Sequence, residues 1–505
     1  MFILLIVILS FAGYWRIFEF TFWKDDWWLL WSGLYNVAGL RDWLHPGTPI
    51  EFMILSSIFG THPFLWQLTG FILHVCVSLA LAAFVRTLVE NQKVGILAGL
   101  FYAASFAGMD AVGWPSAHVV LFVSLMLLVG LRYFTMYVRS RTHLSLTIAL
   151  LYICIALVFD PFRTLPVFLI LPLIIKIIAP KDKTFFTRFF QVELLTMMVI
   201  LWAVVSVLGY HIVGSQLVTH ITGYIQNPVQ LLRHIYIVGN YFNSIANLLF
   251  GWVIRFPEDG STGIYSSFWA RIGFFVFCVT TGIAYAYIKY SRRLIGIILF
   301  GLSWMFIFYL PNWMFEPRLT MGGTHRYMVL SAVGFIALVS YLVSQLKDRV
   351  ILISVSFIFI TANVFMANYF WVQAAHYRSA KHITAFWRQI DSDVPEKLTR
   401  IIFMFSGEDP TKTYGLSLSG PYPYAFNRHI INRVDLPIVT EDRDYLDKLI
   451  CEEEIPLNHI FSWSVTNEGQ ITNRSSRDRL TLLIHALDHD CVPVIDRGAM
   501  PKNTQ

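Results

Sequence analysis

Long apolar runs broken by short polar segments dominate the first 370 residues of the chain. A helix that crosses a membrane needs about 20 mostly apolar residues. The first run has no basic segment before it and no small-residue cleavage site, so we expect an uncleaved span there and not a signal peptide. Runs of this kind predict eleven membrane-spanning helices, at about residues 1–20, 64–85, 94–112, 117–138, 144–160, 164–179, 190–210, 270–289, 294–311, 328–345 and 350–369.

The pattern of apolar positions changes at about residue 371. Short strand-like runs such as 400–405 and helical runs such as 479–486 are separated by turn signals such as 419–423. The sequence therefore predicts an all-α polytopic membrane region over residues 1–370, followed by a small soluble α/β domain over residues 371–505.

Lysine and arginine gather in every second loop of the membrane region. The loops at 86–93, 139–143, 180–188, 289–293 and 346–349 hold twelve of these residues and only three acids. Short cytoplasmic loops carry such an excess of basic residues. With eleven spans, this predicts a cytoplasmic N-terminus and an extracytoplasmic C-terminal domain. We place the chain in a bacterial inner membrane in preference to the endoplasmic reticulum.

One apolar segment, 228–254, is long enough to cross the membrane but does not fit this topology. A crossing there would put the basic loop 289–293 outside, against the charge pattern. Its polar residues Asn240, Asn243 and Asn247 would also face lipid poorly. We therefore expect an interfacial or re-entrant helix within a long outer loop, 211–268.

Composition agrees with a membrane protein and excludes several classes. Of the 505 residues, 56% are hydrophobic and 14% are charged, and the mean hydropathy is +0.58. A soluble protein carries about 25% charged residues, so an ordinary soluble enzyme, a disordered tail and a secreted disulfide scaffold are excluded. The net charge of +6 is not concentrated in a basic patch, which excludes a nucleic-acid partner. Cys451 and Cys491 both lie in the C-terminal domain and could pair in an oxidising compartment.

The first outer loop, residues 21–63, opens with two adjacent carboxylates, Asp25 and Asp26, preceded by Lys24 and surrounded by aromatic residues. Desolvation and mutual repulsion raise the pKa of such a pair, so one of them could accept a proton near neutral pH. Alternatively, the acids cap the N-terminus of an amphipathic helix, and the tryptophans form an interfacial belt.

Two further outer segments carry candidate chemistry. Asp110 ends the third predicted span beside a Trp-Pro turn, where it would serve the reaction or cap the fourth span. The last outer loop carries Arg318, His325 and Arg326, a cationic group that would bind phosphate through charge-assisted hydrogen bonds. The alternative for this group is anchoring to lipid headgroups.

These stretches resemble the GT-C superfamily of membrane glycosyltransferases, which use polyprenyl-phosphate-linked sugars. The resemblance covers residues 1 to about 370 and is greatest to the protein O-mannosyltransferase branch that carries tetratricopeptide repeats, and to its bacterial relatives. Such repeats are missing here, Phe106-Ala107-Gly108 stands where the family has His-Pro, and His118 stands where it often has Arg. The matching elements are Asp25-Asp26, His62-Pro63 through Leu73-His74, Asp110-Ala111-Val112-Gly113-Trp114, the outer segment from Arg233 to Tyr241, and the Arg-Tyr element from His325 to Phe335.

The resemblance implies an inverting sugar transfer on the outer face of the membrane. Asp26 or Asp25 would take the proton of the acceptor hydroxyl, and Asp110 would orient the acceptor or the base. The donor phosphate would be bound by Arg318 and Arg326, assisted by Lys24 and His325, and the acceptor region would include His62, His74 and His118. The partners implied are a polyprenyl-phosphate-linked sugar, membrane lipids, and an acceptor that is a protein, a lipid or a glycan.

This chemistry requires no cofactor, and the sequence supports no metal site. His485, Asp488, His489 and Asp490 form a ligand-like group, but a solvated loop explains them more simply. Two other functions remain open at this point. A transporter or flippase of lipid-linked saccharides would have a similar number of spans, and a non-catalytic anchor would only present the C-terminal domain to a partner.

Overall fold

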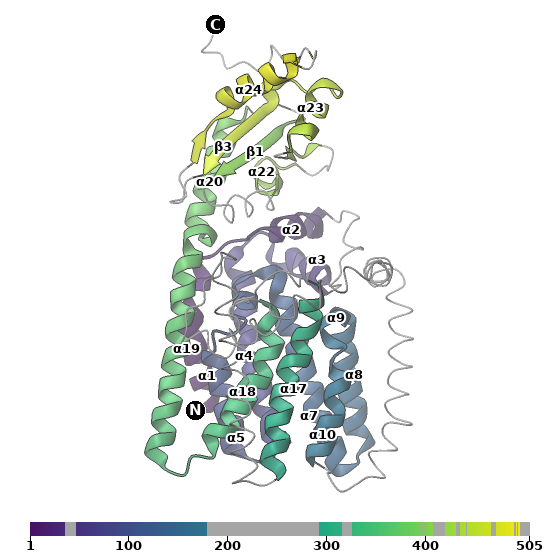
Figure 1. The fold of residues 1–505 in the computed structure, drawn as a ribbon, viewed down its shortest axis with the longest axis vertical. Helices are drawn as coiled ribbons and strands as arrows, with labels where there is room; N and C mark the ends of the chain where they lie inside the picture. The colour runs from purple at the N-terminus through teal and green to yellow at the C-terminus, as the bar shows by residue number, and fades with distance from the viewer. Residues whose placement is uncertain are drawn as a thin grey trace. The chain divides into compact units, whose positions relative to one another are not determined.

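A computed structural model describes residues 1–35, 47–178, 292–315, 326–395, 398, 400–407, 420–430, 435–440, 442–465, 471–488, 491, 493 and 494 (Figure 1). The chain forms two compact units. The first unit comprises Met1–Ile17, Gly39–Glu51 and Leu65–Trp371, and the second comprises Phe18–Ala38, Phe52–Phe64 and Val372–Gln505. Two parts of the predicted first outer loop therefore belong to the same unit as the C-terminal residues.

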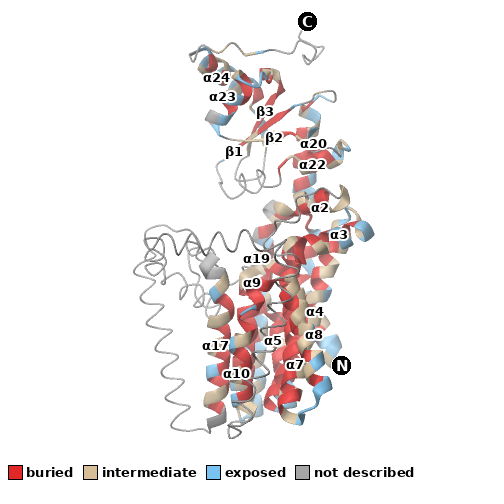
Figure 2. Cartoon of the chain, turned by 90° about the vertical axis from the view of Figure 1, so that its right-hand side faces the viewer, coloured by how far each residue is buried: buried red, intermediate tan, exposed pale blue. Residues whose placement is uncertain are grey.

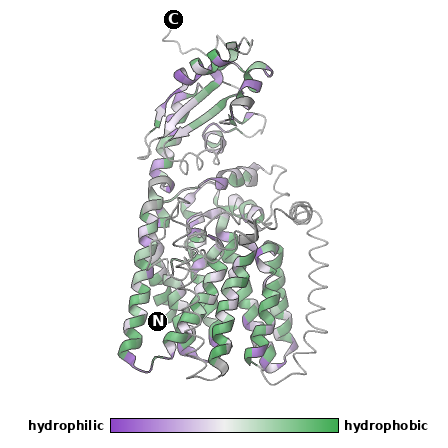
Figure 3. Cartoon of the chain, viewed as in Figure 1, coloured by the Kyte–Doolittle hydropathy of each residue, from purple (hydrophilic) through white to green (hydrophobic). Residues whose placement is uncertain are grey.

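Long apolar helices make up the first unit, and Figure 3 shows hydrophobic residues along most of their length. Exposed aliphatic and aromatic residues on α19, such as Phe357 and Phe365, are suited to contact lipid. The buried positions run along α5, α7 and α10 (Figure 2). The helices are α1 (Phe2–Tyr14), α4 (Pro63–Val89), α5 (Gln92–Ala104), α7 (His118–Ser140), α8 (His143–Phe159), α10 (Val167–Ile178), α17 (Arg292–Phe315), α18 (Val329–Ser344) and α19 (Arg349–Arg378).

Within the described residues, seven helices are long and apolar enough to cross a membrane. They coincide with the predicted spans that begin at residues 1, 64, 117, 164, 294, 328 and 350. The predicted span 144–160 is the shorter helix α8, with 17 residues. The spans predicted at 190–210 and 270–289, and the interfacial helix predicted at 228–254, lie outside the described residues. The count of eleven is therefore not confirmed.

The third predicted span, 94–112, is wrong in its second half. Helix α5 ends at Ala104, and the backbone is extended at Ser105, with ψ of 134°. Gly108 has φ of +72°, and a Cβ atom there would lie 2.6 Å from a side-chain carbon of Val329. Gly108 thus has a left-handed backbone conformation and packs closely against the start of α18. An α-helix cannot continue through this conformation. Asp110 does not end a span but begins the short helix α6 (Asp110–Gly113).

Hydrogen bonds from other helices stabilise this early end of α5. The hydroxyl of Tyr14 donates to the carbonyl of Ser105, and His74 Nε2 lies 3.2 Å from the carbonyl oxygen of Ala103. The Asn363 side chain accepts a hydrogen bond of 3.3 Å from the amide of Phe106. Because backbone groups buried in a membrane protein need partners, these side chains permit the helix to stop inside the first unit.

The second unit contains a four-stranded sheet in the order β2–β1–β3–β4. Strand β1 (Ile402–Gly407) is parallel to β2 (Ile438–Val439) and to β3 (Ile460–Val465), and β4 (Ile471–Asn473) is antiparallel to β3. The strand expected at 400–405 and the helix expected at 479–486 are both present, and the mixture of strands and helices confirms the predicted α/β character of this region.

Alternate residues of β1 face two different layers of helices, as expected for a strand buried on both sides. Ile402 packs into an aliphatic cluster with residues of α23 (Arg443–Cys451) and α24 (Ser475–Asp488). The ring of Phe403 lies 5.2 Å from that of Tyr424 in α22 (Tyr422–Asn427), and the ring of Phe405 lies 6.0 Å from that of Phe386 in α20 (Ala380–Asp393).

A disulfide bond joins Cys451, the last residue of α23, to Cys491, which follows α24. The sequence left this pairing open. The bond closes a loop with a sequence separation of 40 residues, and it fits the predicted location of this domain in an oxidising compartment.

Two helices occupy the predicted first outer loop, α2 (Asp25–Tyr35) and α3 (Gly47–Phe59). The acidic pair stands in the first turn of α2, where the alternative of a capped helix expects it.

Candidate functional site

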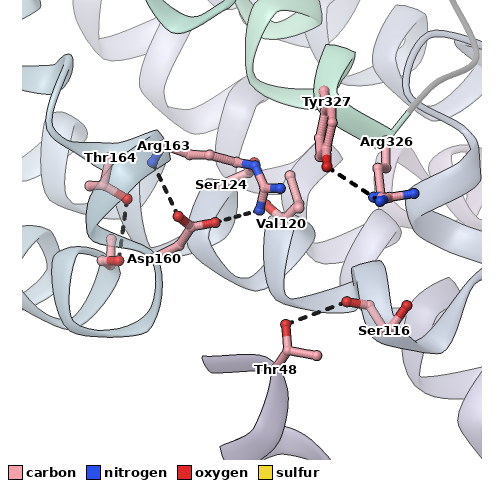
Figure 4. Close-up of polar contacts among 10 residues, drawn as sticks. Thr48, Ser116, Val120, Ser124, Asp160, Arg163, Thr164, Arg326 and Tyr327 are labelled. Atoms are coloured by element: carbon pink, nitrogen blue, oxygen red, sulfur yellow. Dashed lines mark hydrogen bonds and ion pairs between the residues drawn. The ribbon is translucent and has the colours of Figure 1, made fainter. Parts of the chain in front are cut away.

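Arg326 lies in the short helix η5 (Arg326–Met328), directly before α18. Its guanidinium carbon lies 4.2 Å from the ring centroid of Trp114 and 4.8 Å from that of Tyr327. Its Nη2 atom donates a hydrogen bond of 3.3 Å to the Tyr327 hydroxyl (Figure 4). Stacking on two rings and one hydrogen bond together restrict the plane of the guanidinium group. Arg318 and His325, the other cations predicted for this site, lie outside the described residues.

A buried ion pair lies close to Arg326. Helix α8 ends at Phe159, and Asp160 caps the next short helix, α9 (Pro161–Thr164). The Asp160 carboxylate accepts a hydrogen bond of 3.1 Å from the amide of Arg163 and one of 2.6 Å from its guanidinium group (Figure 4). Asp160 is fully buried and Arg163 is 4% exposed. The guanidinium of Arg163 is thereby held in one orientation, and its charge is balanced.

Tyr327 connects the two arginines. The guanidinium carbon of Arg163 lies 4.7 Å from the centroid of the Tyr327 ring, whose hydroxyl accepts the hydrogen bond from Arg326. Two guanidinium groups therefore lie near one ring, and the more accessible of them is Arg326. Asp160, Arg163 and Tyr327 were not among the site residues predicted from the sequence. The run Asp160-Pro161, an N-cap followed by proline, is a signal for a helix start and could have drawn attention to them.

The acid-Ala-Val-Gly-Trp segment brings Asp110 into the same unit. Asp110 is half-buried in the first turn of α6, and Trp114, which stacks on Arg326, follows four residues later. The backbone then forms η3 (Pro115–Ala117) and enters α7 at His118. One short segment of the chain therefore carries both Asp110 and Trp114, the ring on which Arg326 stacks.

His118 is fully buried, and its Nδ1 atom lies 3.2 Å from the Oε1 atom of Glu51. The two atoms are close enough for an ion pair but are not aligned for a hydrogen bond. Glu51, whose side chain is 13% exposed, was not predicted from the sequence. A methyl group at Gly70 of α4 would collide with the ring of His118 and with the carbonyl of Val112, so glycine permits this close approach.

His74 is enclosed by aromatic rings deep in the first unit. Its ring centroid lies 4.4 Å from that of Tyr14 and 5.3 Å from that of Tyr102, and it is 2% exposed. Its described contacts are those of a residue that stabilises the end of α5. Its predicted place in the acceptor region stays a prediction.

The acidic pair belongs to the second unit. Asp26 is fully buried, and its Oδ2 atom accepts a hydrogen bond of 2.9 Å from the amide of Trp23. This is the geometry of a carboxylate that satisfies a free amide at a helix N-terminus. Asp25 is half-buried and is the more accessible of the two acids. Lys24 precedes it with φ of +52°, which sets the sharp turn into α2.

The structure describes few contacts for the remaining predicted residues. His62 is exposed in the turn before α4. His485 Nδ1 lies 3.3 Å from the Oδ2 atom of Asp447, while His489, Asp490 and the side chain of Asp488 lie outside the described residues. Over the part of the chain that the structure describes, no group of three or more His, Cys, Asp or Glu side chains could hold a metal ion.

The sequence matches no protein-family model, and no curated protein matches it significantly. Comparison with solved structures gives partial matches over most of the chain. The crystal structure of ArnT from Cupriavidus metallidurans bound to undecaprenyl phosphate has a TM-score of 0.47 and 11% identity, and the match covers 92% of each chain.

An oligosaccharyltransferase from Archaeoglobus fulgidus, tethered to an acceptor peptide, has a TM-score of 0.45 and 13% identity. The archaeal oligosaccharyltransferase AglB from Archaeoglobus fulgidus, in complex with an inhibitory peptide and a dolichol-phosphate, has a TM-score of 0.45 and 12% identity. These two matches cover 87% of this chain and 64% of the archaeal chain. At these scores and identities the similarity concerns the fold alone, and it assigns no activity.

Proposed function

We propose that the protein is a glycosyltransferase that moves a sugar from a polyprenyl-phosphate donor to an acceptor at the outer face of the membrane. The observation that carries this proposal is the placement of Arg326. It lies at the start of a membrane helix, stacked on Trp114 and Tyr327, with the neutralised Arg163 behind the same tyrosine ring. A planar guanidinium oriented in this way suits a lipid-linked phosphate.

In the proposed reaction the acceptor hydroxyl attacks the anomeric carbon of the donor sugar. A carboxylate takes the hydroxyl proton as the new carbon–oxygen bond forms and the bond to the phosphate oxygen breaks. The polyprenyl phosphate leaves with the bonding electrons, and a single displacement of this kind inverts the anomeric carbon. Arg326 would stabilise the charge that develops on the phosphate, with Arg318, His325 and Lys24 as the further cations proposed for this role.

Asp25 is the carboxylate that we propose as the base. It is more accessible than Asp26, whose side chain accepts the Trp23 amide. Asp110 would orient the acceptor or the base. His62, His74 and His118 keep their proposed place in the acceptor region. We further propose the topology inferred from the loop charges, with the C-terminal domain of residues 371–505 outside and the N-terminus in the cytoplasm.

The test is an assay of bond transfer in proteoliposomes that contain the purified full chain and undecaprenyl-phosphate-linked hexoses labelled in the sugar. An extract of cell-envelope proteins, lipids and glycans supplies the acceptor. We expect release of undecaprenyl phosphate together with label in the acceptor fraction. Arg326→Ala should reduce this release, and Arg139→Ala, at the opposite end of α7 from His118, should not. Movement of the labelled lipid across the bilayer without transfer would instead identify a transporter.

A further inference from the structure

Three aromatic residues of α2 lie on one face of this helix, at positions i, i+4 and i+8. They are Trp27, Trp31 and Tyr35. Trp31 is 1% exposed, and its indole nitrogen donates a hydrogen bond of 3.1 Å to the carbonyl of Ile430. A tryptophan with its nitrogen satisfied by protein backbone is packed inside a protein unit. The interfacial belt considered for these tryptophans therefore does not describe Trp31.

The partner of this face is α22 of the C-terminal domain. The ring of Trp31 lies 5.5 Å from that of Tyr422, and the ring of Trp27 lies 6.0 Å from that of Phe426. Tyr35, two turns after Trp27 along α2, stacks on Phe426 at 6.4 Å. Aromatic pairs at these distances contribute specific contacts in addition to buried area. We call this set of five residues the α2–α22 contact.

Helix α22 is itself firmly held in the domain. Arg428, directly after it, forms an ion pair with the Asp391 carboxylate and donates to the carbonyls of Asp391 and Val394, at 2.7 and 2.9 Å. Asp391 lies in the last turn of α20, and Val394 directly follows this helix. Tyr424 packs edge-on against Phe403 of the central strand β1. The position of α22 is therefore set by the sheet and by α20.

The segment that leads into α2 is held by the same domain. The amide of Thr21 donates a hydrogen bond of 3.1 Å to the carbonyl of Arg378, and Phe20 forms an antiparallel bridge with Ser379 at the start of α20. The buried carboxylate of Asp26 then closes the first turn of α2. The acidic helix is thus held at its beginning and along one face, and every one of these contacts lies within the second unit.

We propose that the C-terminal domain positions the acidic pair, with Trp31 as the main positioning residue, so that the domain is a working part of the transferase. This inference rests on the proposed function. Effective general-base catalysis requires the carboxylate to lie within hydrogen-bond reach of the proton that it takes. A displacement of about 1 Å can cost about 100-fold in rate. The α2–α22 contact supplies this constraint from a domain that is distant in sequence.

The contact is tested first without an activity assay. Tyr35→Cys and Phe426→Cys are combined in the full chain and treated with a short bismaleimide. We expect efficient crosslinking within the chain, and a rate of transfer in the crosslinked protein close to that of the uncrosslinked double variant. Absence of crosslinking would overturn the contact. A crosslinked protein without activity would show that the docked arrangement is not the working one, and would overturn the positioning role.

The positioning role is tested with two substitutions of Trp31. Trp31→Ala should lower kcat about 10- to 100-fold, with the KM for the lipid-linked donor unchanged. Trp31→Phe keeps an aromatic ring at this position and loses the indole hydrogen bond and part of the ring area, so it should retain kcat within about fivefold. Tyr445→Ala removes an exposed aromatic residue from the same domain and serves as the matched control.

Each result can be separated from a failure of the proposed function. If Trp31→Ala raises the donor KM and leaves kcat unchanged, the positioning of the acids is overturned. If Trp31→Phe is as impaired as Trp31→Ala in spite of normal crosslinking, the ring packing is not the cause and the proposal is overturned. A wild-type protein that transfers no sugar would overturn the proposed function and this role together, while the crosslink would still report the contact.

Discussion

The carboxylate of Asp160 and the guanidinium of Arg163 lie 2.6 Å apart, and both side chains are buried in the first unit. The Tyr327 ring contacts both Arg163 and Arg326. A buried charge is tolerated only when it is paired. The ion pair therefore lets the protein keep a second arginine beside the proposed phosphate ligand while the charge of that arginine is balanced.

We expect Asp160→Ala to lower the free energy of unfolding by about 3–5 kcal/mol, because it leaves the charge of Arg163 buried without its carboxylate. Thermal unfolding in detergent measures the loss. Arg139→Ala removes the partly exposed pair with Glu90 and should cost about 1 kcal/mol or less. An equal effect of the two substitutions would contradict the structural importance of the buried pair.

Arg326→Lys should raise the KM for the lipid-linked donor about 10-fold or more, although it keeps the charge. A lysine cannot form the two parallel hydrogen bonds of a guanidinium to phosphate, nor stack flat on Trp114 and Tyr327. Initial rates at varied donor concentration measure the change. A lysine variant with an unchanged donor KM would argue against a phosphate at this position.

The two acids of α2 should respond differently to substitution. Asp25→Asn should reduce kcat about 100- to 10,000-fold with unchanged thermal stability, because it removes the proposed base. Asp26→Ala should lower the stability by about 1 kcal/mol, because the Trp23 amide loses its acceptor. Parallel measurement of kcat and of the unfolding temperature separates the two roles. Full activity of Asp25→Asn would exclude this residue as the base.

Reduction of the disulfide, or Cys451→Ser, should destabilise the second unit by about 3–4 kcal/mol, as the loop length predicts. Thermal unfolding of the oxidised and reduced chain measures this. Alkylation of the native protein in cells, followed by electrophoresis without reductant, reports whether the bond forms. A chain isolated with both thiols free would contradict the predicted oxidising location of this domain.

Gly70→Ala should destabilise the first unit by about 1–3 kcal/mol, since the added methyl group collides with the Val112 carbonyl and the His118 ring. Gly296→Ala is the matched control on α17. Among the described residues its methyl group would meet Ile177 alone, at an ordinary 3.6 Å, and it should be neutral or stabilise the helix by up to about 1 kcal/mol.

Much of the fold could be predicted because its signals are local. A run of 20 apolar residues has few alternatives to a membrane helix, since every backbone group must be satisfied within the segment. Seven predicted spans accordingly appear as long apolar helices. The shift in composition near residue 371 and the run at 400–405 likewise indicated an α/β region, and β1 lies there.

The early end of α5 could not be predicted in this way. The residues from Phe106 to Met109 continue the apolar run of α5, and nothing local forbids a helix. The helix stops because Tyr14, His74 and Asn363, on three other helices, supply hydrogen bonds to the backbone that leaves it. Such partners are recognisable only when the helices are packed together.

The sequence by itself determined the candidate chemistry: acids after the first span, and an Arg-Tyr element at the start of a late one. The tertiary structure decided how these residues are used. It buried Asp26 as a helix cap, left Asp25 more accessible, and placed Arg163 on the ring of Tyr327. The physical reason is that a membrane helix can be predicted from the hydrophobicity of residues adjacent in the sequence. The orientation of a charged side chain depends instead on the groups that packing brings around it.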